Sequence, residues 1–144
     1  MRKAVTFAMA VGLIAIAGLA LPGDKPPPNQ VGDFMRLKLE HSKNVLEGLA
    51  LEDYPMIAKN ADKMSLLSHE ASWNVLQTEE YLLRSGEFRR TAAALTEAAE
   101  EKNLDGAALA YVDLTMKCVN CHKYVREVRM ARFESQPPLR RLKK

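Results

Sequence analysis

The chain has 144 residues, of which 47% are hydrophobic and 27% charged, and its formal net charge is +3. Basic residues gather at both ends, and without them the middle of the chain carries a net negative charge. This charge distribution excludes a typical nucleic-acid-binding protein, whose composition is basic throughout. Apart from its ends, the chain retains on the order of 100 residues, enough for one domain with one core.

The N-terminus has the pattern of an export signal. Arg2 and Lys3 precede an apolar, uncharged run over residues 4–21, and Gly18-Leu19-Ala20 places small residues before a cleavage point after Ala20. We therefore expect residues 1–20 to be a signal peptide and the rest of the chain to be periplasmic or otherwise exported. The apolar run is close to the length that spans a membrane, so an uncleaved anchor is the alternative.

Two short segments flank the expected domain. Residues 21–30 (Leu-Pro-Gly-Asp-Lys-Pro-Pro-Pro-Asn-Gln) predict an extended Pro-rich spacer. Residues 134–144 form a basic tail, in which Pro137 and Pro138 end the last helix. A solvated chain end is one interpretation of the tail, and contact with anionic lipid or an acidic redox partner is the other. The domain itself is expected over residues 31–133.

The first half of this domain predicts two helices. The first is expected over about residues 30–51. Asp53 has the character of an N-cap, and Pro55 suits the first turn of a second helix that extends through Ala71 toward Trp73. The apolar face of the first helix is expected to comprise Phe34, Leu37, Val45, Leu46 and Leu49.

The second half predicts two more helices. Residues 74–86 are interpreted as an irregular connection, with a short helical turn after Thr78 as an option, and Ser85 as the cap of a third helix that ends near Asn103. Asp105 is expected to cap the fourth. Because no segment alternates with period two, the fold class is all-α. Four amphipathic helices with short connections predict an antiparallel four-helix bundle.

One motif carries most of the functional information. Cys118-Val119-Asn120-Cys121-His122 has the C-x-x-C-H form of a c-type haem attachment site, and it contains both cysteines of the chain. The thiols add to the vinyl groups of haem, and the imidazole of His122 binds the iron as proximal ligand. On a helix these three side chains share one face, because they are spaced i, i+3 and i+4. We therefore expect one covalent haem near the C-terminus of the last helix.

Three other interpretations of the cysteine pair remain open. A redox dithiol normally lies at the start of a helix within a βαβ unit, whereas this pair lies well inside a helical segment. A disulfide over this spacing would close a very small loop and stabilise little. Zinc would require four ligands, and only His41 and His69 remain to complete the set.

The position of the motif resembles the class II cytochromes c, the family of cytochrome c-prime and cytochrome c-556, over about residues 30–133. In that family the motif lies near the C-terminus of the last of four helices. Arg126 matches a basic position after the family's histidine, which implies a place in the haem environment, whereas the neighbouring aromatic residue is displaced to Tyr124. Met35-Arg36 matches the family's Met-Lys pair in the first helix. The family's propionate-binding arginine falls at Val31, so that contact is not expected.

The sixth iron ligand is expected to decide function. Met35 is the main candidate; Met64 and His41 are weaker ones, and His69 is expected to be structural or exposed. Each candidate methionine also has a simpler interpretation as a core residue. Aromatic residues expected in the core or haem pocket are Trp73, Phe88 and Tyr111. Three basic residues have two interpretations, a rim at the haem edge and, favoured, ordinary solubility of the helix: Lys123, Arg129 and Arg132.

These expectations define two functions. Ligation by Met35 predicts a six-coordinate, low-spin haem that exchanges electrons with a redox partner protein. An apolar distal face predicts a five-coordinate haem, similar to cytochrome c-prime, that binds nitric oxide or carbon monoxide. An enzyme is not expected, because no distal His–Arg pair or other proton-transfer group is evident. The resemblance also implies a homodimer.

Overall fold

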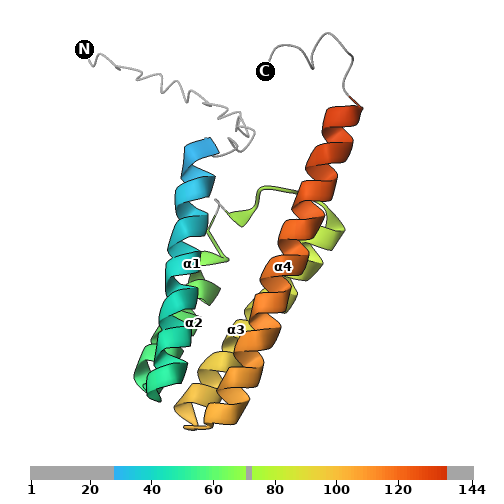
Figure 1. The fold of residues 1–144 in the computed structure, drawn as a ribbon. Helices are drawn as coiled ribbons and strands as arrows, with labels where there is room; N and C mark the ends of the chain where they lie inside the picture. The colour runs from blue at the N-terminus through green and yellow to red at the C-terminus, as the bar shows by residue number, and fades with distance from the viewer. Residues whose placement is uncertain (1–27, 71–72, 136–144) are drawn as a thin grey trace, which may run out of the picture.

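The protein is a bundle of four helices. The computed structural model describes residues 28–70 and 73–135, and within these ranges it contains no strand. The helices run alternately in opposite directions along the bundle (Figure 1). An all-α, antiparallel four-helix bundle is therefore confirmed. Its helices are α1 (Pro28–Leu51), α2 (Tyr54–Leu67), α3 (Glu79–Glu100) and α4 (Leu104–Glu134).

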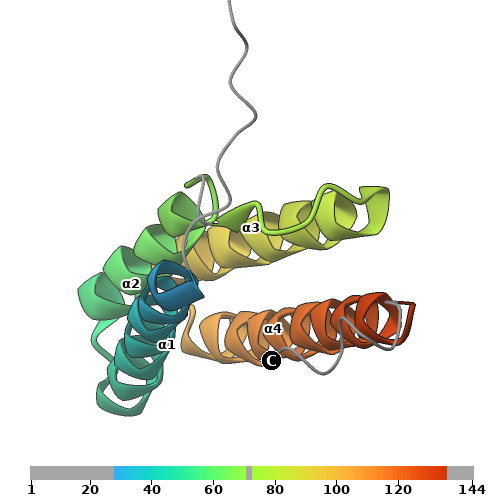
Figure 2. The ribbon, with the colours of Figure 1, turned by 90° about the horizontal axis from the view of Figure 1, so that it is seen from above.

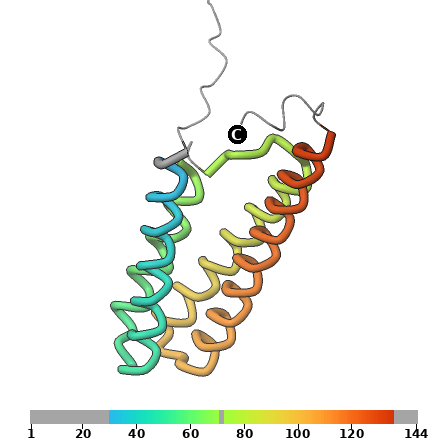
Figure 3. The backbone as a smooth tube through the Cα atoms, turned by 45° about the horizontal axis from the view of Figure 1, so that its top comes forward, coloured from blue at the N-terminus to red at the C-terminus, as the bar shows by residue number. Residues whose placement is uncertain are grey.

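The bundle is not equally closed on all sides. α1 packs on α2, α2 on α3 and α3 on α4, whereas α1 and α4 touch only lightly. Seen from above, the helices follow one another around the bundle in the order α1, α2, α3, α4, so that α1 and α4 are neighbours (Figure 2). They diverge toward the end at which α1 begins and α4 finishes (Figure 3). The bundle is thus open between its first and last helices.

Several predictions for the chain ends lie outside the described residues. These are the signal peptide or anchor over residues 1–20, most of the spacer, and Pro137 and Pro138 in the tail. No helix in the two described ranges is long and apolar enough to cross a membrane.

The helix starts follow side-chain caps. Asp53 caps α2 as predicted, with its carboxylate accepting from the Met56 amide at 2.9 Å. The cap predicted at Asp105 is wrong, because the Asn103 side chain accepts from the Gly106 amide at 2.9 Å and α4 begins one residue later. Asp105 lies in the first turn, where its charge complements the helix dipole.

The third helix starts earlier than predicted. Thr78 caps α3 by accepting from the Tyr81 amide, so Ser85 lies inside the helix and is not its cap. Ser85 is tolerated there because its hydroxyl donates to the Tyr81 carbonyl one turn earlier, at 2.8 Å. The prediction that the second helix extends through Ala71 is also wrong, because α2 ends at Leu67. The connection therefore covers residues 68–78, and its described part contains the buried Trp73 and Leu76.

The buried face of α1 also differs from the prediction. Leu37 is 41% exposed and Leu46 56% exposed, whereas Lys38 is 7% exposed. The heptad spacing of Val31, Lys38 and Val45 defines the inward face, and Leu37 and Leu46 lie to either side of it. The buried hydrophobic core comprises Val45, Ile57, Ala61, Met64, Trp73, Leu76, Tyr81, Phe88, Ala92, Leu95, Ala99, Ala107 and Leu114.

Gly48 permits the close approach of α1 and α2. A methyl group at this position would lie 2.9 Å from Ile57 Cγ1, and 3.2 Å from both the Asp53 carbonyl oxygen and the Ile57 amide nitrogen. Two of these three neighbours are backbone atoms, which cannot move aside without shifting the start of α2. The absence of a side chain at Gly48 thus sets the distance between the two helices.

We expect Gly48→Ala to lower the free energy of unfolding by about 1–3 kcal/mol, because the added methyl group overpacks this contact. Gly32→Ala is the matched control on the same helix, since a methyl group there meets nothing within 4 Å. The control should be neutral or stabilising by up to ~1 kcal/mol through helix propensity. Urea unfolding followed by circular dichroism measures both, and equal effects would contradict the close-approach argument.

Candidate functional site

A large cavity lies between α1 and α4. Its volume is about 900 Å³, near the upper end of the roughly 300–1,000 Å³ range of small-molecule sites. α1 and α4 form its two long walls, and side chains from α3 and the α2–α3 connection lie at its back. The cavity thus occupies the side on which the bundle is open (Figure 3).

The wall formed by α4 contains the sequence motif. Cys118, Cys121 and His122 all line the cavity, as their helical spacing predicted, and Val125 continues the same wall. The motif lies in the middle of a helix of 31 residues, so its predicted place near the C-terminus of the last helix is wrong, because α4 continues for about three further turns to Glu134. It is equally far from the N-terminus of α4. The position is therefore unlike that of a redox dithiol, which depends on a helix N-terminus to stabilise its thiolate.

The electrostatics of the thiols also differ from those of a redox dithiol. Cys118 and Cys121 are free and half-buried. Burial raises the pKa of both thiols above 9.0, against the opposing effect of the Lys38 charge. The thiols are accordingly protonated at neutral pH, whereas a redox dithiol has a lowered pKa. Within residues 28–70 and 73–135, no group of three or more histidine, cysteine, aspartate and glutamate side chains gathers as the zinc interpretation requires.

His122 keeps a neutral ring near pH 7. Burial lowers its pKa, and the positive charges of Arg126 and Lys38 lower it further. A neutral imidazole is the form that binds a metal ion. Arg126 is exposed and does not line the cavity, so its influence on this site acts through the His122 ring. Its place in a haem environment stays a prediction.

The wall formed by α1 carries the buried Lys38. Its Nζ lies 3.6 Å from the ring centroid of Trp73 and 3.5 Å from that of Phe88. It has no hydrogen-bond partner among the described residues. Burial, the largest effect, lowers the pKa of Lys38 from 10.5 to about 7. Met35 lines the same wall and is half-buried.

The back of the cavity is held by a chain of hydrogen bonds around Trp73. Its indole Nε1 donates to Ser85 Oγ at 2.8 Å, and Ser85 Oγ donates to the Tyr81 carbonyl at 2.8 Å. The Tyr81 hydroxyl in turn donates to the Trp73 carbonyl. Phe88 packs against Trp73 with ring centroids 5.4 Å apart. These contacts fix both aromatic rings in the cavity wall, as predicted for Trp73 and Phe88.

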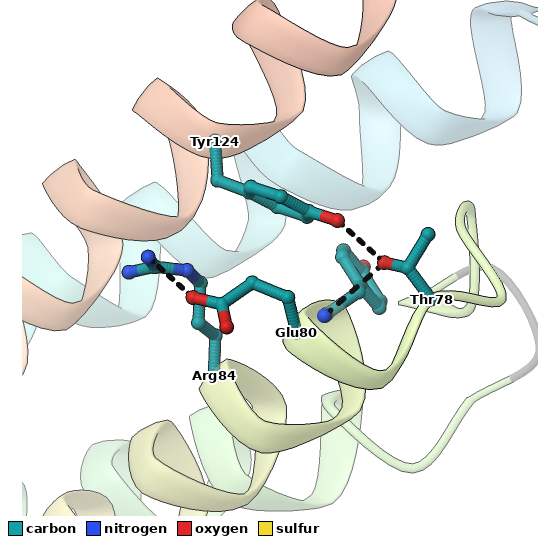
Figure 4. A network of polar contacts seen from close by, with 5 residues as sticks. Thr78, Glu80, Arg84 and Tyr124 are labelled. Carbon is teal, nitrogen blue, oxygen red and sulfur yellow. Dashed lines mark hydrogen bonds and ion pairs between the residues drawn. The ribbon is translucent and has the colours of Figure 1, made fainter.

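The motif region of α4 is fastened to the start of α3 (Figure 4). The Tyr124 hydroxyl lies 2.7 Å from the Thr78 hydroxyl, and the Arg84 guanidinium lies over the Tyr124 ring, 5.5 Å from its centroid. Arg84 also pairs with Glu80. Tyr124 therefore faces α3 rather than the cavity, whereas Val125, the next residue, lines the cavity.

Three other predicted residues lie outside the cavity lining, namely His41, Tyr111 and His69. His41 Nδ1 donates to Asn60 Oδ1 on α2 at 2.9 Å, an acceptor that also receives the Asn44 side-chain amide. Tyr111 joins α4 to α1 through its hydroxyl, 3.2 Å from Ser42 Oγ. His69 is exposed beyond the end of α2. Met64 does line the cavity, as one of its most deeply buried side chains.

The charged side chains of the cavity lining are all basic. They are Arg36, Lys38, Lys117, Arg129 and Arg132. Arg36 pairs with Asp33 at 3.1 Å and Lys117 with Asp113 at 3.6 Å, whereas Arg129 and Arg132 form no ion pair with any described residue. Both arginines are exposed residues of the lining, whereas Lys123 is exposed outside it.

Lys38 is the site residue that sequence reasoning missed. Lysine on an amphipathic helix is normally assigned to the solvated face. The available signal was the spacing of seven residues that places Lys38 between Val31 and Val45, on the same face as Met35 and Val45.

No family model, no curated protein and no solved structure matches the chain. Evidence for its function therefore comes from the motif and from the cavity that the motif lines.

The raised pKa of both thiols predicts their reactivity. In the chain without haem, alkylation of Cys118 and Cys121 should be slow at pH 7 and should still be accelerating at pH 9, because burial disfavours the thiolate. Alkylation rates from pH 6 to 10 measure this, with the urea-unfolded chain as control. A rate that levels off below pH 7 would instead indicate an activated dithiol.

The lowered pKa of Lys38 predicts a stability that rises with pH. Between its folded value of about 7 and its ordinary value of 10.5, the unfolded chain binds a proton that the folded chain does not, so raising the pH favours folding. We expect the haem-free chain to gain about 1 kcal/mol between pH 7 and 8. Above about pH 8 the buried thiols oppose this gain, because their ordinary pKa is 9.0 and is raised in the folded chain, and Tyr81 opposes it at still higher pH.

Urea unfolding of the haem-free chain at several pH values between 7 and 8 measures this slope. Lys38→Met should remove it, whereas Lys43→Met, a change at an exposed lysine of the same helix, should retain it. An unchanged slope in Lys38→Met would assign the effect to other groups.

Proposed function

We propose that the chain is an exported monohaem cytochrome of the c type that transfers electrons to or from a redox partner protein. The observation that carries this proposal is the position of the C-x-x-C-H motif on the wall of the cavity. Two protonated thiols and a neutral imidazole face a space of about 900 Å³ from one helix face. Attachment of haem to a C-x-x-C-H motif uses these same groups.

The residues present fit a haem. Cys118 and Cys121 would hold it through thioether bonds, and His122 would bind the iron. Trp73 and Phe88 offer large aromatic surfaces to the macrocycle. When bound, the group supplies a one-electron Fe(III)/Fe(II) couple, and the chain's own residues determine its ligands, burial and access to solvent.

The charge of the cavity supports the same cofactor. Among the residues that the structure describes, five basic side chains and no carboxylate line it. Haem carries two propionate groups, and Arg129 and Arg132 are available to pair with them because neither is engaged in an ion pair within the described residues. An anionic, largely apolar ligand would match both the apolar lining of this cavity and its positive charge.

Electron transfer is favoured over gas binding by the facing helix. α1 brings Met35 and Lys38 to the cavity, and α2 adds Met64, so groups able to bind iron lie across from His122. A six-coordinate haem excludes an exogenous ligand and suits electron transfer. A five-coordinate haem that binds nitric oxide or carbon monoxide would require all of these groups to remain unbound.

The resemblance to class II cytochromes c is consistent with this proposal. The motif lies in the last of four antiparallel helices, and Met35 lines the cavity. At the position of the family's arginine, Val31 lines the cavity instead, and Arg129 and Arg132 provide positive charge from α4. Export, a possible membrane contact through the signal or basic tail, and a homodimer stay predictions of the sequence.

Covalent haem attachment is the first test. Expressed with its leader and a c-type maturation system, the chain should carry one haem that survives denaturation and extraction with acidic organic solvent. Cys118→Ser/Cys121→Ser should carry none, because no thioether can form, while His69→Ala should carry as much as the wild type. In-gel haem staining and intact mass measure this, and a wild-type chain without covalent haem would overturn the proposal.

The spectrum of the holoprotein separates the two functions. An electron carrier should be low-spin in both oxidation states and unchanged by carbon monoxide, because both axial positions are filled. A high-spin ferrous spectrum that shifts on addition of carbon monoxide would transfer the proposal to the gas-binding alternative. Absorption spectra of oxidised, reduced and carbon-monoxide-treated protein are sufficient to decide.

A further inference from the structure

Lys38 has an unusual environment for a lysine. Its side chain projects from α1 into the cavity, the residue is 7% exposed, and its Nζ has no hydrogen-bond partner among the described residues. Removing an ammonium group from water without a partner costs several kcal/mol. A group that enters the cavity is therefore needed to satisfy this nitrogen.

The two aromatic rings do not meet that need. Nζ lies 3.6 Å and 3.5 Å from the centroids of Trp73 and Phe88, which gives favourable cation–π contacts. These contacts leave the N–H groups without acceptors, since an ammonium group has three donors to place. The rings do fix the direction of the side chain, so the nitrogen is held inside the cavity rather than reaching for solvent.

A haem brings two kinds of partner for this nitrogen, its propionates and its iron. The propionates lie on the edge of the macrocycle away from the vinyl groups, and the vinyl groups are bound by Cys118 and Cys121. Lys38 lines the same cavity as Cys118, Cys121 and His122, from the opposite wall. Arg129 and Arg132 are meanwhile available for the propionates.

We propose that Lys38, rather than Met35, supplies the sixth ligand of the haem iron through its Nζ, with His122 as the other axial ligand. The inference rests on the proposed function, because it requires a haem in the cavity. The N–Fe bond forms from the lone pair of the neutral amine, and the proton released by the ammonium group passes to solvent.

Burial prepares Lys38 for this role. The buried Nζ has no partner among the described residues, and an amine that binds a metal ion does so in its neutral form. Met35 has no comparable need for a partner. It is half-buried and its thioether packs equally well against apolar neighbours. A nitrogen ligand also implies a lower reduction potential than a thioether would give.

The test compares four haem-loaded full-length proteins: wild type, Lys38→Leu, Lys38→Arg and Met35→Leu. Wild type and Met35→Leu should be low-spin and indifferent to carbon monoxide. Lys38→Leu should become high-spin in the ferrous state and bind carbon monoxide. Lys38→Arg should behave like Lys38→Leu, because a guanidinium keeps the charge and the cation–π contacts but has no lone pair to give.

Electron paramagnetic resonance and near-infrared spectra of the wild type provide a second readout that needs no variant. A nitrogen–nitrogen axial pair lacks the charge-transfer band of a thioether–iron bond. The inference is overturned if the wild type shows that band or is already high-spin, if Met35→Leu opens the carbon monoxide site, or if Lys38→Arg retains the wild-type spectrum.

The amount of covalent haem distinguishes failure of the inference from failure of the proposed function. A wild type that attaches haem but lacks the nitrogen–nitrogen signature overturns Lys38 ligation alone. A wild type that attaches no haem overturns both.

Discussion

The incomplete contact between α1 and α4 determines the rest of the site. Ser42 and Tyr111 join the two helices by a hydrogen bond, and beyond it, toward the start of α1 and the end of α4, the helices separate (Figures 1 and 3). The space between them is bounded by α3 and by Trp73 in the α2–α3 connection. The motif on α4 therefore faces a cavity instead of packing against a neighbouring helix.

An open cavity of this size lowers the stability of the bundle, and its walls keep their positions only if contacts outside the cavity hold them. Two polar networks provide these contacts. The Trp73–Ser85–Tyr81 hydrogen bonds fix the back of the cavity, and the Tyr124–Thr78 hydrogen bond fixes α4 beside the motif (Figure 4). Both networks involve the first turns of α3. The start of α3 at Thr78, one short connection after Trp73, is therefore the local feature that positions both walls.

The number and order of the helices, the Asp53 cap and the common face of Cys118, Cys121 and His122 could all be predicted from the sequence. These follow from periodicity and from local hydrogen bonding, which act within a few residues. The start of α3 could not be predicted in the same way. Ser85-Gly86 resembles a helix start, and only the tertiary contact of Ser85 with Trp73 explains why serine is accommodated inside the helix.

The burial of Lys38 was the main feature that local patterns did not reveal. Assigning apolar residues to the inward face selected Leu37 and Leu46, which are exposed, and so rotated that face away from its true position. The inward face includes Lys38 because Trp73 and Phe88, distant in sequence, supply the aromatic rings that accept its side chain. Lysine is polar on every hydropathy scale, and Lys38 is buried here by contacts that form only in the folded chain.

The distribution of charge in the cavity connects these observations to function. Among the described residues, the unpaired basic groups of the cavity are the buried Lys38 on α1 and the exposed Arg129 and Arg132 on α4, and no carboxylate lines the cavity. A bundle core built only for stability would place an apolar side chain at position 38, since an unpartnered buried charge lowers stability. The two exposed arginines match the two carboxylates of a haem, and the buried lysine matches the electron-pair acceptor at its centre. The same cofactor that the thiols and imidazole would attach thus also accounts for the buried Lys38, which the described part of the fold leaves without a partner.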